Sequence, residues 1–273
     1  MSGPAARRRV VAVRGGDRRT LRDRLAAEEP MEIRVTGPDG ATGAVAVTMR
    51  TPGHDFELAA GFLVTEGVVA PGSISRVAYC DDVDRERQRF NVVTVRSTGP
   101  VAAAADRAHA MTSACGVCGT TSLDAVEVRC DPLPDGPAVE GGALLAMPGR
   151  LRELQRVFDA TGGLHAAGLF DPEGNLLLAR EDIGRHNAVD KVIGAAALAG
   201  DLPLHDRVLV VSGRAGFEIV QKSAVAGIPV LAAVSAPSSM AADAAERVGM
   251  TLVGFLRDDG YNVYCGAERI GGA

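Results

Sequence analysis

The 273-residue sequence contains no tryptophan, and aromatic residues make up only 4% of it. Proteins that bind single-stranded nucleic acids usually stack the bases on aromatic side chains, so this function is not expected. The formal net charge of -5 also argues against binding to bulk nucleic acid or to anionic membranes. We therefore expect neither nucleic acid nor a membrane among the binding partners.

Long apolar segments are also missing. No apolar run approaches the roughly 18 residues that a membrane-spanning helix needs. The arginines near the N-terminus are not followed by the apolar segment of a secretory signal. The sequence thus predicts a soluble, cytoplasmic protein. Its five cysteines do not suggest a disulfide framework in such a protein, and only Cys115 and Cys118 are close in sequence.

Lysine is nearly absent, because Lys191 and Lys222 are the only two in the chain. All other basic residues are arginines, and eight of them fall within residues 1–24. The simplest interpretation of residues 1–24 is a solvated, partly frayed basic tail. The alternative is a docking arm for an acidic partner or a phosphate.

The next part of the chain has the pattern of a small α+β domain over residues 25–110. Apolar and polar residues alternate over residues 31–35, and residues 44–49 are mostly apolar, so both segments are expected to be strands. The turn residues Gly37 to Gly40 lie between them, which predicts a hairpin. A helix is expected over residues 55–63. Two further strands are expected over residues 74–80 and 90–95. Residues 111–140 are expected to form a loop and linker that carries Cys115 and Cys118.

Residues 141–273 alternate between helix-like and strand-like segments. Helices are expected over residues 147–160, 185–199, 216–226 and 238–248. Strands are expected over residues 164–170, 176–179, 207–211, 229–234, 251–255 and 262–265. This alternation is typical of the α/β class, with a mainly parallel sheet and helices on both of its faces.

The strongest local motif is Cys115-Gly-Val-Cys118. A thiolate is the nucleophile of sulfur chemistry, and a nearby positive charge, helix N-terminus or second cysteine lowers its pKa. Two cysteines at this spacing can carry sulfur, form a redox-active disulfide or supply half of a zinc site. The glycines and the Ser/Thr-rich surroundings favour the sulfur carrier over a thioredoxin-like dithiol. A non-catalytic zinc-binding module remains the alternative.

Four polar segments follow predicted strands, and three of them open helices: residues 181–191, 212–222, 235–239 and 255–260. Open α/β sheets bind ligands at the carboxyl ends of strands, and helix N-termini favour anions. The alternative for each segment is an ordinary turn, with His186 as a core residue. The candidate ligand-binding residues are His186, Lys191, Ser212, Gly213, Arg214, Lys222, Phe255, Leu256, Arg257, Asp258, Asp259 and Gly260.

The motifs together resemble those of the formate dehydrogenase accessory sulfurtransferase family (FdhD/NarQ). The resemblance covers most of the chain beyond the N-terminal segment, with its motifs in the same order. It is carried by residues 50–63, 115–118, 161–165, 181–191, 212–222 and 255–260.

The resemblance implies that Cys115 accepts sulfur as a persulfide from a cysteine desulfurase. The sulfur would then pass to the molybdenum (or tungsten) bis(molybdopterin guanine dinucleotide) cofactor, a bound substrate, before that cofactor enters formate dehydrogenase. Cys118 would assist the transfer or resolve the persulfide. The family's cofactor-binding stretch corresponds to Phe255 through Gly260. The resemblance also implies a homodimer, and no permanently bound metal is expected.

The order of elements in residues 141–273 also resembles the cytidine deaminase-type fold, which implies three layers and a cofactor-binding role. Zinc deaminases need H-x-E at one helix start and P-C-x-x-C at the next. Here the first place reads His186-Asn-Ala and the second reads Ser212-Gly-Arg-Ala-Gly. The catalytic glutamate and the cysteine ligands are therefore missing, and deamination is not expected.

Overall fold

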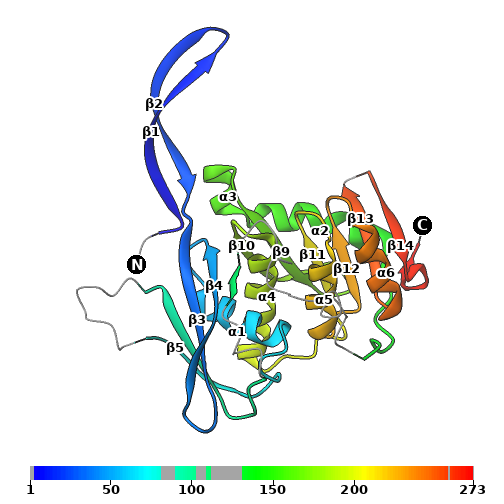
Figure 1. Ribbon diagram of the computed structural model, residues 1–273. Helices are drawn as coiled ribbons and strands as arrows, with labels where there is room; N and C mark the ends of the chain where they lie inside the picture. The colour runs from blue at the N-terminus through cyan, green and yellow to red at the C-terminus, as the bar shows by residue number, and fades with distance from the viewer. Residues whose placement is uncertain (1–2, 81–89, 103–108, 112–130, 258, 273) are drawn as a thin grey trace.

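The structure is a computed structural model that describes residues 3–80, 90–102, 109–111, 131–257 and 259–272. A six-stranded sheet forms the centre of the C-terminal half, in the order β10-β9-β11-β12-β13-β14 (Figure 1). Its strands are β9 (His165–Phe170), β10 (Leu176–Asp182), β11 (Val208–Val211), β12 (Val230–Ala233), β13 (Thr251–Arg257) and β14 (Gly260–Cys265).

This sheet is mixed, so the prediction of a mainly parallel sheet was wrong. Only β11, β12 and β13 run parallel to one another. The pairs β9–β10, β9–β11 and β13–β14 are antiparallel. Short turns join β9 to β10 and β13 to β14, and such turns can connect only antiparallel neighbours because a parallel crossover needs a dozen or more residues.

Helices cover both faces of the sheet, as expected, and make three layers. One face carries α2 (Gly141–Glu153), and the other carries α4 (Arg185–Ala199), α5 (Phe217–Val225) and α6 (Ser239–Arg247). Residues of the central strands alternate between two apolar clusters: Leu209 and Val211 face α4–α6, whereas Val208 and Val210 face α2. Because successive side chains of a strand point to opposite faces of the sheet, a strand made of valine and leucine contributes to both apolar clusters.

The helix expected over residues 147–160 is two helices. α2 begins earlier and ends at Glu153, and α3 spans Arg156–Thr161. Gln155 between them has φ −80° and ψ 61°, which is outside the helical region and interrupts the helix. The two-residue strand β8 (Val139–Glu140) precedes α2 and pairs with β15 (Ile270–Gly271), which follows the short 3-10 helix Ala267–Arg269.

The N-terminal half contains a five-stranded sheet in the order β5-β6-β3-β4-β7. The predicted hairpin, helix and two following strands are confirmed. The elements are β3 (Glu29–Thr36), β4 (Thr42–Arg50), α1 (Asp55–Thr65), β5 (Ile74–Tyr79), β6 (Val92–Ser97) and β7 (His109–Met111). One face of this sheet buries Ile33, Val35, Val93 and Val95 together with Leu58 of α1.

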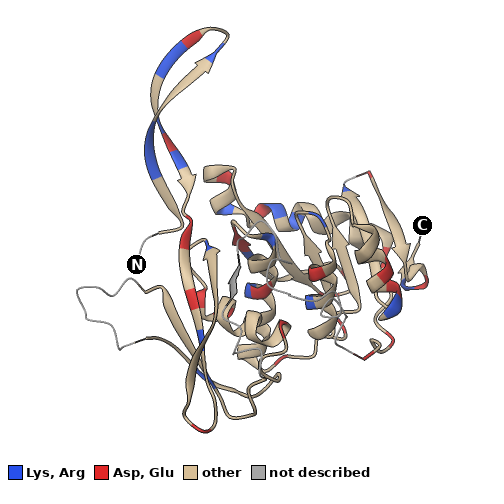
Figure 2. Ribbon diagram, in the orientation of Figure 1, with Lys and Arg blue, Asp and Glu red and all other residues tan. Residues whose placement is uncertain are grey.

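Residues 5–26 form a two-stranded antiparallel hairpin, so the prediction of a frayed N-terminal tail was wrong. Strand β1 (Ala5–Arg14) pairs with β2 (Asp17–Ala26) along its whole length. The hairpin projects from the body (Figure 1) and carries much of the visible basic charge (Figure 2). The valines in this arginine-rich segment are β-branched and favour the extended backbone of a strand.

The two halves meet where α1 crosses α4. A Cβ atom on Gly61 of α1 would lie 1.8 Å from the carbonyl oxygen of Asp190, and a Cβ on Gly194 of α4 would lie 1.8 Å from that of Glu57. Glycine is therefore required at both positions, because the two helix backbones touch. Nearby, Arg180 of β10 donates two hydrogen bonds to the carboxylate of Glu57 and adds a second link between the halves.

We predict that Gly61→Ala and Gly194→Ala each destabilise the protein by about 3 kcal/mol or more, because overpacking forces the helices apart. Urea denaturation measures the loss. Gly149→Ala is the matched control, since a Cβ on this α2 residue meets nothing within 4 Å. The control should be neutral or stabilise by up to about 1 kcal/mol. If all three substitutions changed the free energy of unfolding equally, the close contact between the α1 and α4 backbones would be contradicted.

Candidate functional site

Four polar loops lie at one edge of the six-stranded sheet, where β10, β11, β12 and β13 end. We call this region the carboxyl edge and define it as residues 182–186, 212–218, 234–238, 255–257 and 259–260. Strand β9 runs antiparallel to β11, so its first residue, His165, lies at the same edge opposite Asp182. The predicted convergence of the loops is thus present in the fold.

Backbone hydrogen bonds join the loops to one another. The amide of Ser235 donates to the carbonyl of Gly213 (3.3 Å), and the amide of Phe255 donates to the carbonyl of Ser235 (3.1 Å). Ser238 donates to the carbonyl of Ala215 (3.0 Å). Three loops that follow three successive strands therefore form one connected surface, which can hold a ligand in a fixed position.

Ser212 and Gly213 are placed by strand β9. The amide of Ser212 donates to the carbonyl of Ala166, and the Ser212 hydroxyl accepts from the Ala166 amide (both 2.9 Å). A Cβ on Gly213 would lie 3.2 Å from Nδ1 of His165. The loop therefore passes close against the His165 ring, and a larger residue at position 213 would press on it.

Charged and titratable groups gather beside this loop. Nε2 of His186 lies 2.8 Å from Oε2 of Glu218, and both side chains are largely buried. Burial acts to raise the pKa of Glu218, but the His186 contact and the charges of Lys222 and Arg185 outweigh it and lower the pKa. Burial and the charges of Arg185 and His186 lower the pKa of His165. His165 is therefore neutral at pH 7, while Glu218 is ionised.

The N-termini of α4 and α5 open onto the carboxyl edge. Their N-cap residues are Gly184 and Gly216, and neither supplies a capping side chain. By contrast, Ser238 caps α6 through its side chain. Uncapped helix N-termini present amide hydrogens and a partial positive charge, which suit a phosphate. Arg214 is exposed on the same loop as Gly216.

Phe255 has an unusual backbone conformation. Its φ is +54°, in the left-handed region that a bulky residue adopts only under strain. Its side chain is 40% exposed. A register shift in the β13–β14 ladder accompanies it. Strained residues of this kind cluster at functional sites, and here the strain presents a phenyl ring to solvent at the edge of the sheet.

The neighbours of Phe255 have different positions. Arg257 and Asp259 are exposed, and Gly260 begins β14. Leu256 is fully buried in the cluster on the α2 side of the sheet, so its side chain supports the fold beneath the edge and does not reach a ligand. Asp258 lies outside the described residues.

Lys191 belongs to the interior of the protein. Its side chain is 1% exposed, and Nζ lies 2.7 Å from Oδ2 of Asp182. Nζ also donates to the carbonyls of Thr51 (3.0 Å) and Glu181 (3.3 Å). All three N–H groups of the ammonium therefore have partners in the protein, which corrects the prediction that Lys191 contacts a ligand.

Lys222 is enclosed in the same way. Its Nζ contacts Oε1 of Glu66 (2.8 Å), Oδ1 of Asp190 (3.0 Å) and Oγ1 of Thr65 (2.9 Å). Burial acts to lower the pKa of Lys222, but the two carboxylates outweigh it and raise the pKa, so the amine stays charged. Lys222 thus links α5 to α1 and α4, and it too has no donor left for a ligand.

Cys115 and Cys118 lie outside the described residues, but the chain before them has a clear position. Strand β7 ends at Met111, four residues before Cys115, and it pairs with β4 so that Met111 is opposite Thr48. The Thr48 hydroxyl donates to Oδ1 of Asn187, near the start of α4. Strand β7 therefore leads toward the carboxyl edge.

Sequence reasoning did not anticipate the roles of His165 and Asn187. Nδ2 of Asn187 donates to Oδ1 of Asp182 and to the carbonyl of Met49, so it connects the β10–α4 loop to β4. The position of His165 depends on β9 being antiparallel to β11, and the sequence pattern favoured a parallel sheet. For Asn187, the only signal was its place directly after His186.

Within the described ranges, no group of three or more His, Cys, Asp or Glu side chains is arranged to hold a metal ion. The zinc alternative depends on the cysteine pair, which lies outside those ranges. No helix in the described part of the chain is long and apolar enough to span a membrane.

Comparison with known proteins identifies close relatives. The model of the FdhD/NarQ family matches residues 26–271. A protein named sulfur carrier protein FdhD from Streptomyces coelicolor is 52% identical over 272 residues, covering 97% of this chain and 95% of the relative. The protein of the same name from Mycobacterium tuberculosis is 49% identical over 280 residues, covering 99% of this chain and all of the relative.

A solved structure shares the fold. It is the crystal structure of a protein from Desulfotalea psychrophila described as a formate dehydrogenase accessory protein, with a TM-score of 0.74 and 24% sequence identity. The alignment covers 98% of this chain and 99% of the other. This likeness shows that the mixed α/β architecture is that of a known protein fold.

We predict that Lys222→Met costs about 3–5 kcal/mol, because it leaves the carboxylate of Asp190 buried without its counter-ion. The double variant Lys222→Met/Asp190→Leu should recover most of this loss. Arg207→Met is the control, since its pair with Asp206 lies at the surface and should cost at most about 1 kcal/mol. Equilibrium urea unfolding measures all three. A loss for Lys222→Met as small as the control's would show that Lys222 is not structural.

Proposed function

Because the chain belongs to the FdhD/NarQ family, we propose that it is a sulfur carrier in the maturation of formate dehydrogenase. The observation that carries this proposal is the identity of about half of all residues, over nearly the whole length, with proteins named sulfur carrier protein FdhD. The Cys115-Gly-Val-Cys118 motif provides thiols of the kind that this function requires.

In the proposed first step, the thiolate of Cys115 attacks the outer sulfur of a persulfide on a cysteine desulfurase. A sulfur–sulfur bond forms at Cys115, the bond to the desulfurase cysteine breaks, and that cysteine leaves as a thiolate. The number of sulfur–sulfur bonds is unchanged, so this step needs no oxidant or reductant. Cys115 then carries the persulfide.

Release of the sulfur as sulfide requires two electrons, and the proposal assigns them to Cys118. Its thiolate attacks the Cys115 sulfur, a Cys115–Cys118 disulfide forms, and the terminal sulfur leaves as hydrosulfide. A cellular thiol must then reduce the disulfide before the next cycle. This step gives the two cysteines different roles, with Cys115 as carrier and Cys118 as resolving residue.

The proposed recipient is the molybdenum bis(molybdopterin guanine dinucleotide) cofactor, bound as a substrate at the carboxyl edge. The uncapped N-termini of α4 and α5 suit its diphosphate groups. Arg214 and Arg257 are exposed and can grip phosphate oxygens in a bidentate manner. The exposed ring of Phe255 offers a face for the guanine, and Asp258 or Asp259 can accept from its amino group.

The position of β7 supports delivery from the cysteine pair to this edge. Met111 lies beside Thr48, which hydrogen-bonds to Asn187 near the start of α4. Four residues of chain span at most about 14 Å, and four residues separate Met111 from Cys115. This short length of chain from Met111 supports delivery by the proposed carrier cysteine to that part of the edge.

The proposal also includes the cellular setting. A persulfide carrier requires reduced thiols, which favours the cytoplasm. Formate dehydrogenase and a cysteine desulfurase are its proposed protein partners. The resemblance that first indicated the family also favours a homodimer.

We predict that incubation with a cysteine desulfurase and cysteine adds one sulfur atom to Cys115, detected by intact-mass and peptide mass spectrometry. Cys115→Ala should abolish this gain. Cys118→Ala should keep the added sulfur but block its release as hydrosulfide, because the Cys115–Cys118 disulfide cannot form. Cys265→Ala is the control, because burial raises the pKa of this thiol and makes it a poor nucleophile. Active formate dehydrogenase in cells that contain only Cys115→Ala would refute the carrier role.

We also predict that GDP, a fragment of the cofactor, raises the melting temperature. A ligand at ten times its Kd adds about 1.4 kcal/mol to stability, which gives a shift of a few degrees. Phe255→Gly should fold, because glycine relieves the positive φ, but it should lose most of the shift. Phe90→Gly relieves a similar φ of 53° away from the carboxyl edge and should keep the shift. Equal GDP shifts in both variants would argue against a guanine site at Phe255.

A further inference from the structure

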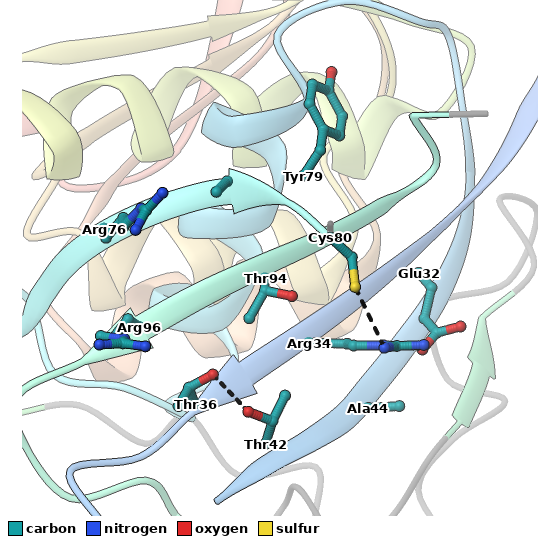
Figure 3. A pocket seen from close by; sticks show the side chains of 11 residues that line it. Glu32, Arg34, Thr36, Thr42, Ala44, Arg76, Tyr79, Cys80, Thr94 and Arg96 are labelled. Atoms are coloured by element: carbon teal, nitrogen blue, oxygen red, sulfur yellow. Dashed lines mark hydrogen bonds and ion pairs between the residues drawn. The ribbon is translucent and has the colours of Figure 1, made fainter. Parts of the chain in front are cut away.

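A second polar site lies on the outer face of the five-stranded sheet. It is a cavity of about 550 Å³, and we call it the arginine groove (Figure 3). It is lined by Glu32, Arg34, Thr36, Thr42, Ala44, Arg76, Ala78, Tyr79, Cys80, Thr94 and Arg96.

The strand register explains the shape of this groove. One row across the sheet is formed by Ala78, Thr94, Arg34 and Ala44, which are paired in turn from β5 to β4. The next row is Arg76, Arg96, Thr36 and Thr42. Alanines and threonines thus form a low floor between long arginine side chains. The alternate residues of the same strands point the other way and pack on α1.

Arg76 and Arg96 form an unfavourable pair. They lie directly opposite each other on β5 and β6, and like charges in this position repel each other. Both are exposed, and in the part of the chain that the structure describes neither forms a salt bridge. Two arginines held side by side on a floor of small residues form a receptor for negative charge.

Arg34 also lines the groove, where the carboxylate of Glu32 balances its charge, so the unbalanced positive charge comes from Arg76 and Arg96. Nε of Arg34 donates to Oε1 of Glu32 (2.6 Å), and its NH1 lies 3.8 Å from Sγ of Cys80. The hydroxyls of Thr36 and Thr42 lie 2.8 Å apart, and that of Thr94 also lines the groove. Hydroxyl and guanidinium groups both donate hydrogen bonds that phosphate oxygens accept.

We propose that the arginine groove binds a compact, multiply charged oxyanion of the phosphate type, with Arg76 and Arg96 as its principal ligands. Among the described lining residues no aromatic face is available to stack on a base, because the Tyr79 ring points away from the groove (Figure 3). Its hydroxyl donates to Oδ2 of Asp55, the first residue of α1. The lining is also too polar for an apolar peptide segment. The inference is independent of the proposed sulfur-carrier function.

The groove and the carboxyl edge are different sites. The groove lies on the face of the N-terminal sheet opposite α1, whereas the carboxyl edge lies on the C-terminal sheet beyond α1 and α4. An anion that binds one of them therefore has no contact with the arginines of the other, so separate substitutions can distinguish the two.

Isothermal titration calorimetry with inorganic diphosphate, at constant ionic strength, tests this proposal. Arg76→Gln/Arg96→Gln should weaken binding at the groove at least tenfold. The control Arg214→Gln/Arg257→Gln changes the same number of exposed arginines at the carboxyl edge and should leave the groove affinity within about twofold. The absence of diphosphate binding to the unmodified protein at millimolar concentration would overturn the proposal. Undiminished binding by Arg76→Gln/Arg96→Gln would do so as well.

The stability of the variants provides a second readout. Removing one of two repelling arginines should leave the melting temperature of Arg96→Gln equal to or above that of the unmodified protein when no anion is present. Diphosphate should raise the melting temperature of the unmodified protein more than that of Arg96→Gln. A lower melting temperature of Arg96→Gln without diphosphate would show that this arginine is a structural residue and would contradict its assignment as a ligand.

Discussion

The contact between the backbones of α1 and α4 determines how the two halves of the molecule are arranged. Because Gly61 and Gly194 have no side chain, each helix can approach a backbone carbonyl oxygen of the other. The two backbones lie so close that no side chain fits between them. Around this contact, buried charges connect elements far apart in sequence: Asp190 of α4 meets Lys222 of α5 and Thr65 of α1. The position of the N-terminal sheet, and with it the strand that leads to the cysteine pair, follows from this packing.

A second buried network fixes the start of α4. The carboxylate of Asp182 accepts from the amides of Thr51 and Gly184 and pairs with Lys191. Buried ion pairs contribute little net stability because desolvation offsets the Coulombic attraction. Their effect is on geometry, since any shift of the β10–α4 loop away from β4 would leave charges without partners. The proposed delivery from the cysteine pair to the carboxyl edge joins two halves of the chain, and it needs such a constraint to keep them in register.

Much of the fold could be predicted from the sequence, and the failures have physical causes. Periodicity identified most helices and strands of the C-terminal half to within a few residues, because strands such as Val208–Val211 are uniformly apolar and bounded by polar turns. It could not give strand direction, and for this reason the sheet was expected to be mainly parallel and His165 was not placed at the edge. The N-terminal hairpin was missed because its strands are exposed on both faces, so they have no apolar side and no period-two pattern in the sequence.

The roles of the two lysines were mistaken for a related reason. Their rarity singled them out, and rarity suggested a ligand. The structure gives a different reason why lysine occurs there. An ammonium has three donors at one point, and in both cases three oxygens enclose it. Arginine spreads five donors over a plane, and the buried Arg50 has no hydrogen-bond partner for its Nε among the described residues. Lysine is therefore the cation that this core can satisfy completely, whereas the flat guanidinium fits surfaces that meet oxyanions. Arginine also serves the fold where its partner is a carboxylate that accepts side by side, as Glu57 does from Arg180, but a single ammonium suits a small pocket of three separate oxygens better.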